Sequence, residues 1–142
     1  MVDISAKPVV RREAVAEGFI ELNSGTIRAI REKRLEKGDA EEIAKLGAIT
    51  AGKRTSEILM LCHPIPIESF EVDVKVEKDG VRVTSHVVAL AKTGVEMEAL
   101  TAVAMGLLNV WDVTKKYEKD AQGQYPSTAI RDIHVVRKVK KQ

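Results

Sequence analysis

A chain of 142 residues, with 31% charged and 44% hydrophobic residues, suits one globular domain spanning 1–142 and excludes a disordered protein. The 23 basic and 21 acidic residues nearly cancel, so overall charge predicts no nucleic-acid binding, and the single Cys62 excludes an internal disulfide framework or a Cys-based zinc site. No apolar run is long enough to span a membrane and the first residues lack a signal-peptide core, so we expect a cytoplasmic protein without membrane contact.

The first elements are a strand and a short helix. The alternation over Val9–Leu22 is imperfect and predicts a strand with an irregularity at Gly18. Asn23 or Ser24 can cap the helix that follows, and its apolar spacing continues up to the break at Lys37–Asp39.

A second helix is predicted to begin directly after Asp39. This residue can serve as the N-cap, and acidic side chains follow it in the first turn, where the helix dipole favours them. Ile43, Leu46 and Ile49 form one apolar stripe at helical spacing. We expect the helix to run past Lys53 and toward Leu59.

Two strands of a hairpin come next. Pro64 and Pro66 forbid regular helix, and Ile67–Glu77 alternates valines with charged residues, which predicts a strand with one face in water. The turn Lys78–Gly80 carries a hairpin signal, and the alternation continues from Val81 on the return strand.

A long helix and a last strand complete the chain. The segment after Gly94 is rich in Ala, Leu and Met and predicts a deeply buried helix, and Ile130–Val139 predicts the final strand. Helices on one face of a four-stranded antiparallel sheet make a ferredoxin-like α+β sandwich. This fold serves enzymes, regulatory domains and RNA-binding modules, so it does not select a function.

Two short motifs in the first half of the chain could carry chemistry. Ala51–Thr55, read as AGKRT, places Lys53 and Arg54 near a helix end, where the dipole stabilises cations without any function. The motif LCHPIP sets Cys62 and His63 in a stiff, irregular segment of the kind that active-site loops use. A lone histidine is nevertheless more often structural than catalytic, and the cysteine beside it can simply fill the core.

Two further motifs lie at the ends of the long helix. Glu96 and Glu98 flank Met97 at its start, where acids also complement the helix dipole. Asp112 and Lys115 are three residues apart near its end and therefore lie on one face. They form either an ordinary ion pair or a carboxylate that orients a lysine general acid or base.

The four motifs AGKRT, LCHPIP, KTGVEMEALTA and WDVTKK occur in this order, and together they resemble the cyclic pyranopterin monophosphate synthase family, the C proteins of molybdenum cofactor biosynthesis. The resemblance runs from Met1 to Lys116, and Lys37–Asp39 fits it as well. One departure is the tail, which ends in VVRKVKKQ where many members have a Lys-Ser-Gly-Gly-like sequence.

The resemblance implies a lyase that converts cyclised dihydro-GTP into cyclic pyranopterin monophosphate and releases pyrophosphate. It also implies a homohexamer, a trimer of dimers with active sites at subunit interfaces. Asp112, Lys115 and Lys53 match the family's catalytic residues. The matching substrate-binding positions are Leu61, Cys62, His63, Glu96, Met97 and Glu98.

The residue chemistry agrees with this assignment. Lys53, Arg54 and Lys115 can supply cations for a triphosphate, and Glu96 and Glu98 can accept hydrogen bonds from a pterin-like ring. The sequence shows no metal-ligand motif and no cofactor, although Mg²⁺ could assist the phosphate chemistry.

Two other classes of function compete with the enzyme. An RNA-recognition module needs aromatic side chains on its central strands, and here only Phe70 is present. A non-catalytic regulatory domain that binds a nucleotide or a pterin fits the fold and the basic sites better. It would tolerate the loss of Lys115, whereas the enzyme would not.

Overall fold

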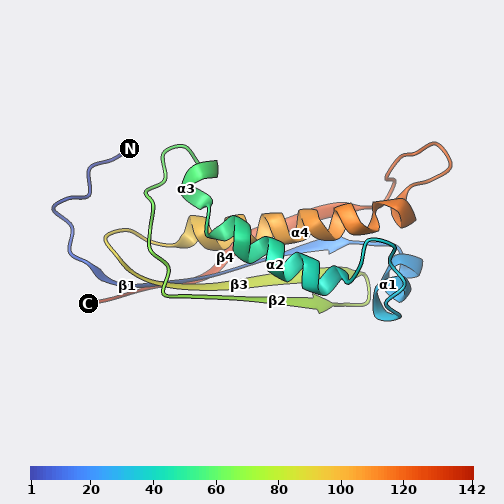
Figure 1. Cartoon of the computed structure of the whole chain (residues 1–142), viewed down its shortest axis with the longest axis horizontal. Helices are drawn as coiled ribbons and strands as arrows, with labels where there is room; N and C mark the ends of the chain where they lie inside the picture. Colours follow the sequence, from blue (N-terminus) through green and yellow to red (C-terminus); the bar gives the residue numbers. More distant parts are fainter.

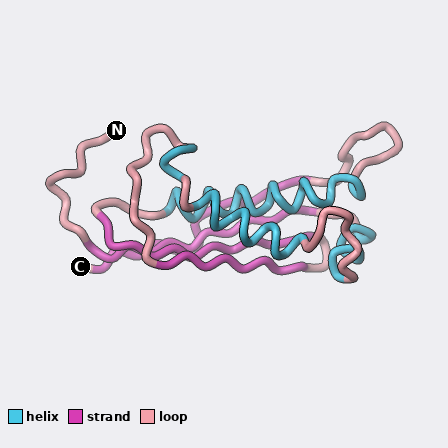
Figure 2. Tube along the Cα trace, in the orientation of Figure 1, coloured by secondary structure: helices cyan, strands magenta, loops and turns pink.

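The computed structural model describes residues 1–142, and its strands form one antiparallel sheet in the order β2-β3-β1-β4. Helices α2 and α4 cover one face of this sheet, as Figure 1 and Figure 2 show. The order of the elements confirms the predicted ferredoxin-like α+β sandwich. The elements are β1 Val10–Glu21, α1 Ser24–Arg31, α2 Ala40–Gly52, α3 Thr55–Ile58, β2 Ser69–Val76, β3 Gly80–Ala91, α4 Glu96–Glu118 and β4 Ala129–Lys141.

The irregularity predicted at Gly18 is confirmed on one side of β1. The pairing with β3 runs without interruption, whereas the pairing with β4 shifts register between Val15 and Ala16 and again between Glu17 and Phe19. A Cβ atom added at Gly18 would come within 2.9 Å of side chains on α4 and β4. The glycine therefore lets the long helix approach the centre of the sheet closely.

The β2–β3 hairpin is also confirmed. The valines of β2 face the helices and its charged residues face water, as the alternation requires. The turn closes through the N–H of Glu77, which donates to the carbonyl of Gly80 at 2.8 Å. An added Cβ at Gly80 would collide with the carbonyl oxygen of Ile20, so the return strand begins at a residue without a side chain.

The predicted apolar stripe of α2 is wrong. The buried face consists of small residues, and Leu46 is 64% exposed, while Ile43 and Ile49 are only partly buried. Small side chains allow α2 to pack close to α4, which presents small residues of its own at Ala102 and Gly106. The buried positions repeat every fourth residue, at Ala40, Ala44, Ala48 and Gly52.

The ends of the first two helices also differ from the prediction. Helix α1 ends at Arg31 rather than near Lys37, because the chain turns through a positive φ of 57° at Lys33. The N-cap at Asp39 is confirmed, since its carboxylate accepts hydrogen bonds from two backbone N–H groups at 2.9 and 3.2 Å. Helix α2 stops at Gly52, and the separate turn α3 follows it.

Helix α4 lies over the centre of the sheet and contributes the largest share of the core. Leu107 and Val110 are fully buried against strand residues such as Ile20 and Val83. Each such side chain stabilises the fold by ~1.5–3 kcal/mol. None of the helices combines the length and hydropathy needed to cross a membrane.

Candidate active site

A cavity of about 610 Å³ lies at the end of the sheet where α4 begins. Its walls come from the N-terminal segment, the loop after α3 and the first turn of α4. All six residues predicted to bind substrate line it, namely Leu61, Cys62, His63, Glu96, Met97 and Glu98. Residues that are 35 positions apart in the sequence thus meet in one site.

The loop that carries His63 is held in place by the start of the chain. The His63 ring nitrogen Nε2 lies 2.8 Å from the carbonyl oxygen of Val2. Val2, Ile4 and Lys7 themselves line the cavity. The N-terminal segment is therefore part of the site.

Glu96 and Glu98 experience opposite environments. Partial burial opposes the ionisation of Glu96, but its ion pair with Lys138, a backbone hydrogen bond and the charge of Arg12 together outweigh this and lower the pKa of the carboxyl. Glu98 is only 4% exposed, and its burial raises the pKa of the carboxyl, with the nearby charge of Glu96 adding to the effect. One oxygen of Glu98, Oε2, has no hydrogen-bond partner.

Cys62 lies beside these acids. Burial, and then the charge of Glu98, raise the pKa of the Cys62 thiol. A thiol in this environment stays protonated and is a poor nucleophile. The geometry thus supports Cys62 as part of the cavity wall and not as a reacting group.

Two of the three predicted catalytic residues, Asp112 and Lys115, form a cluster near the end of α4 that lies opposite the cavity. The Asp112 carboxylate accepts hydrogen bonds from Lys37 Nζ at 3.0 Å and from Lys115 Nζ at 3.1 Å. These two contacts, Lys37 first, hold the pKa of Asp112 below its usual value. The predicted pairing of Asp112 with Lys115 is confirmed, and Lys37 joins it as a third member.

The two ends of α4 are far apart. Sixteen residues separate Glu96 from Asp112, and at a rise of 1.5 Å per residue this corresponds to roughly 24 Å. Lys53 lies nearer the cavity end of α4, because the preceding residue, Gly52, packs against Ala102 of that helix. Lys53 itself does not line the cavity. Within one chain, Lys53 therefore lies far from Asp112 and Lys115, the other two predicted catalytic residues.

Three functional candidates escaped the sequence prediction. The sequence marks Lys37 as part of a helix break and of the family resemblance but not as a site residue, it gives no signal for Lys7, and Lys138 lies in the tail that departs from the family pattern. Lys138 reaches the site because β4 extends to Lys141, beside the start of β1. The basic composition of the tail was the one available signal.

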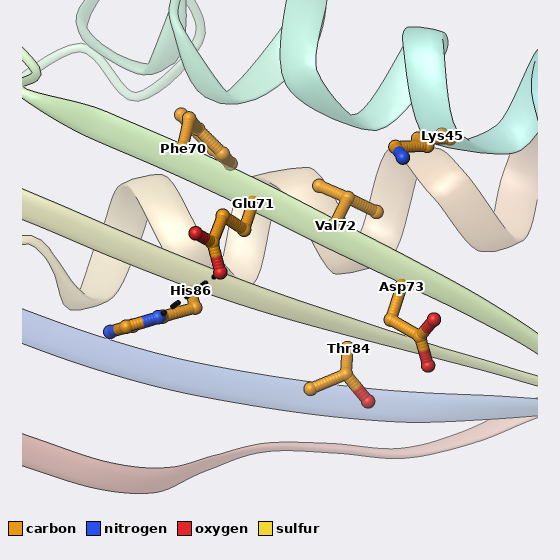
Figure 3. Close-up of a pocket in the computed structure, with 7 residues that line it drawn as sticks. All are labelled: Lys45, Phe70, Glu71, Val72, Asp73, Thr84 and His86. Carbon is orange, nitrogen blue, oxygen red and sulfur yellow. Dashed lines mark ion pairs between the residues drawn. The ribbon is translucent and has the colours of Figure 1, made fainter.

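A second hollow, of about 410 Å³, lies at the edge strand β2 (Figure 3). Glu71, Asp73 and His86 line it on the face of the sheet that lacks helices, while Phe70 lies toward α2. None of the predicted site residues is present. The cavity at the start of α4 is therefore the better candidate, because it is lined by six of the predicted site residues.

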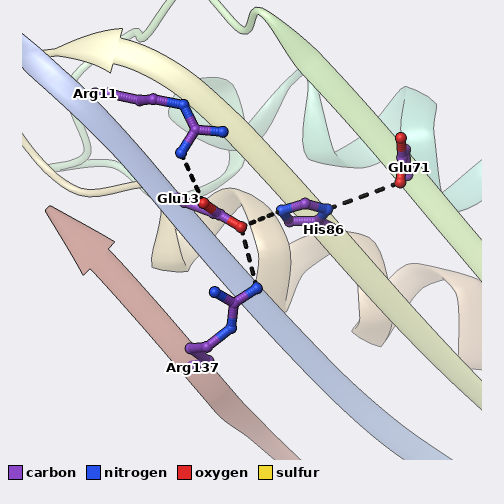
Figure 4. A network of polar contacts seen from close by, with 5 residues as sticks. All are labelled: Arg11, Glu13, Glu71, His86 and Arg137. Carbon is purple, nitrogen blue, oxygen red and sulfur yellow. Dashed lines mark hydrogen bonds and ion pairs between the residues drawn. The ribbon is translucent and has the colours of Figure 1, made fainter. Parts of the chain in front are cut away.

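The uncovered face of the sheet also carries a polar network that crosses all four strands (Figure 4). Glu13 accepts from Arg11 at 2.7 Å and from Arg137 at 3.1 Å, and its carboxylate lies 2.7 Å from His86 Nε2. His86 in turn lies 3.7 Å from Glu71. Each partner belongs to a neighbouring strand or to β1 itself, so the network ties the strands together.

The side chains do not form a metal site of their own. No three His, Cys, Asp or Glu residues are grouped so that they could hold a metal ion.

Comparison with known proteins covers nearly the whole chain. The model of the MoaC family matches residues 1–141. The chain is 54% identical to a probable cyclic pyranopterin monophosphate synthase of Sulfurisphaera tokodaii, over 99% of this chain and 93% of the relative. Proteins of the same name from Sulfolobus acidocaldarius and Saccharolobus solfataricus are 54% and 55% identical, over 99% of this chain and 98% and 94% of the relatives. The chain therefore belongs to the MoaC family.

Proposed function

We propose that this protein is a cyclic pyranopterin monophosphate synthase, a lyase of molybdenum cofactor biosynthesis. It converts cyclised dihydro-GTP into cyclic pyranopterin monophosphate and releases pyrophosphate. The observation that carries the proposal is the cavity at the start of α4, which gathers all six predicted substrate-binding residues. The names of relatives that are 54% and 55% identical support it.

The cavity suits the purine-derived ring of the substrate. Glu96 is an ionised hydrogen-bond acceptor for ring N–H groups, and Met97 offers an apolar wall. Lys7 and Lys138 provide cations at its edges. A small number of fixed polar groups in a mainly apolar cavity is the usual design of such a site.

The cluster of Lys37, Asp112 and Lys115 suits the phosphate chemistry. A sugar hydroxyl attacks the α-phosphorus, a new P–O bond forms, and the bond to pyrophosphate breaks. The two ammonium groups, both held by Asp112, stabilise the negative charge that develops on the leaving pyrophosphate. Proton transfer to or from Lys115 is the general acid–base role that we assign to this residue.

A single nucleotide cannot contact groups roughly 24 Å apart along one helix. We therefore propose that each active site combines the cavity of one subunit with the Lys37–Asp112–Lys115 cluster of another. The assembly we propose is a homohexamer, a trimer of dimers, with its active sites at subunit interfaces. Light scattering tests the assembly, since the hexamer has six times the 15.6 kDa mass of the chain.

The first experiment tests the reaction itself. The purified protein is incubated with cyclised dihydro-GTP, and pyrophosphate and the pterin product are quantified together. The two products are expected in equal amounts. Binding of the substrate without either product would instead support the non-catalytic nucleotide- or pterin-binding regulatory domain.

A mixing experiment tests the composite site. Lys53→Ala and Lys115→Ala are each expected to abolish turnover while the oligomer persists. If the two lysines serve one site from different subunits, mixed and reassembled variants recover roughly a quarter of the sites. Mixtures that stay as inactive as the separate variants would contradict the composite site.

We further propose that Mg²⁺ assists the reaction only as a complex with the phosphates of the substrate. Turnover with EDTA and with added Mg²⁺ tests this, and a metal bound to the protein before substrate is added would contradict it. A cytoplasmic location is also part of the proposal. The free Cys62 supports it, because reducing compartments keep thiols unpaired.

A further inference from the structure

Two carboxyl groups in the first turn of α4 differ in the partners they have. Glu96 forms an ion pair with Lys138 of β4, and the charge of Arg12 on β1 also favours its ionised form. Glu98 forms no ion pair, is 4% exposed, and leaves its Oε2 atom without a hydrogen-bond partner. Both residues line the same cavity.

The other titratable groups that line the cavity do not compensate Glu98. They are Lys7 in the N-terminal segment and Cys62 and His63 in the loop after α3. Cys62 is neutral for the reasons given above, and His63 Nε2 contacts the carbonyl of Val2.

A backbone N–H group donates to the Glu98 carboxyl and lowers its pKa, but burial outweighs this contact. A carboxylate that is buried without a cation and with one oxygen unpaired is costly, and such a group usually binds a proton instead. When the environments of two neighbouring carboxyls push their pKa values apart, one is ionised and the other neutral, and the two take different chemical roles in an active site. Glu96 has the environment of an ionised acceptor. Glu98, which lines the same cavity with one oxygen unpaired, has the environment of a neutral acid.

We propose that Glu98 meets the substrate as a neutral carboxylic acid and donates a hydrogen bond to an acceptor atom of the purine-derived ring, while Glu96 accepts from the ring as a carboxylate. A neutral carboxyl offers one O–H donor and one C=O acceptor, which suits a ring that carries both kinds of atom along one edge. A site with two carboxylates would offer acceptors only. The identity of this ligand rests on the proposed function.

The first test measures the thermal stability of Glu98→Gln and of the matched control Glu96→Gln from pH 4 to 9. The pKa of Glu98 is raised by folding, so its stabilising effect is lost as pH rises through that value, and Glu98→Gln gains melting temperature relative to wild type with rising pH. The pKa of Glu96 is lowered by folding, so its effect is lost as pH falls, and Glu96→Gln loses melting temperature relative to wild type with rising pH. Slopes of the same sign would overturn the proposal.

If Glu98→Gln does not fold, a carboxyl-carbon NMR titration of the wild-type protein gives the same answer. A Glu98 carboxyl that titrates at the ordinary pKa of a glutamate would overturn the proposal.

The second test follows KM for cyclised dihydro-GTP against pH. In wild type, KM is expected to rise several-fold as Glu98 ionises, whereas Glu98→Gln keeps a donor and its KM stays level over the same interval. Identical profiles would overturn the hydrogen bond to the ring. Absence of turnover in wild type would overturn the proposed function, but the opposite slopes of the thermal test would still establish the neutral acid.

Discussion

Lys37 and Asp112 lie 75 residues apart in the sequence, and the Lys37 ammonium group donates to both the carboxylate of Asp112 at 3.0 Å and its backbone carbonyl at 3.3 Å. The contact joins the loop before α2 to the last third of α4. It places a second cation beside the predicted Asp112–Lys115 pair. The loop therefore contributes to the phosphate-handling cluster, which the motif WDVTKK alone does not reveal.

Lys37→Ala is expected to lower turnover by at least ~100-fold, because one of the two cations that stabilise the leaving group is lost. The melting temperature should hardly change, since the Lys37 and Asp112 side chains are 48% and 56% exposed and exposed ion pairs contribute little to stability. The measurements are steady-state kinetics and thermal unfolding.

The matched control is Lys116→Ala. Lys116 pairs with Glu36 at 2.6 Å in the same part of the molecule, but it does not contact Asp112. Turnover at the wild-type rate is expected. Equal losses in the two variants would show that general surface charge, not the contact to Asp112, matters.

Gly18→Ala is expected to destabilise the fold by ~1–3 kcal/mol, the usual cost of overpacking a core. The new methyl group would press on Val103, Leu107 and Ile133. Urea unfolding measures the change. Gly25→Ala is the control, since an added Cβ meets no atom within 4 Å there and should stabilise α1 by ~0.5–1 kcal/mol. A neutral Gly18→Ala would mean that α4 moves away from the sheet at little cost.

The sequence predicted the architecture well where its signals are local. The β2–β3 hairpin follows from strict alternation and a turn, and the Asp39 cap follows from side-chain chemistry within three residues. The buried face of α2 could not be found in this way, because large apolar residues such as Leu46 give a stronger signal than the alanines that actually pack. Lys37 and Lys138 escaped for a related reason, since their acidic partners are distant in the sequence.

The site prediction shows the same limit. The six residues predicted to bind substrate line one cavity, and Asp112 pairs with Lys115. The sequence placed these two groups at opposite ends of one helix, but it did not show that Lys7 joins the first group and Lys37 the second, nor the distance of roughly 24 Å between them. The length of α4 sets that distance, and it is the reason for proposing a second subunit in each site.

The network around Glu13 predicts that the fold loses stability as the pH falls into the acid range. A hydrogen bond from Arg11, a second contact with His86 and the charge of Arg137 lower the pKa of Glu13 to about 2. Because the folded pKa lies below the unfolded value, the stability that Glu13 contributes is complete above about pH 4.5 and is lost as pH falls toward 2. Arg11→Gln removes the largest cause, so the loss should be smaller than in wild type and should be complete at a higher pH. Thermal unfolding between pH 2 and 6 measures it, and an unchanged profile would contradict the role of Arg11.

Glu118 is the buried acid with a structural role, in contrast to Glu98. It is 2% exposed, and its carboxylate accepts from the N–H of Asn23 at 3.0 Å, from the hydroxyl of Thr128 at 2.6 Å and from the hydroxyl of Thr26. These contacts join the end of α4 to the start of α1 and to the segment that enters β4. Glu118 also lies three residues after Lys115, so it fixes the end of the helix that carries the phosphate-handling cluster.

Glu118→Ala should therefore cost ~2–4 kcal/mol in urea unfolding, because three donors lose a buried acceptor at once. Glu118→Gln should cost less, since the amide keeps one oxygen and a threonine hydroxyl can rotate to accept from its N–H group. The exposed Glu36→Ala serves as the control and should change stability little. Equal costs for the alanine and glutamine variants would show that the charge of Glu118, and not its hydrogen-bond geometry, holds the helix end in place.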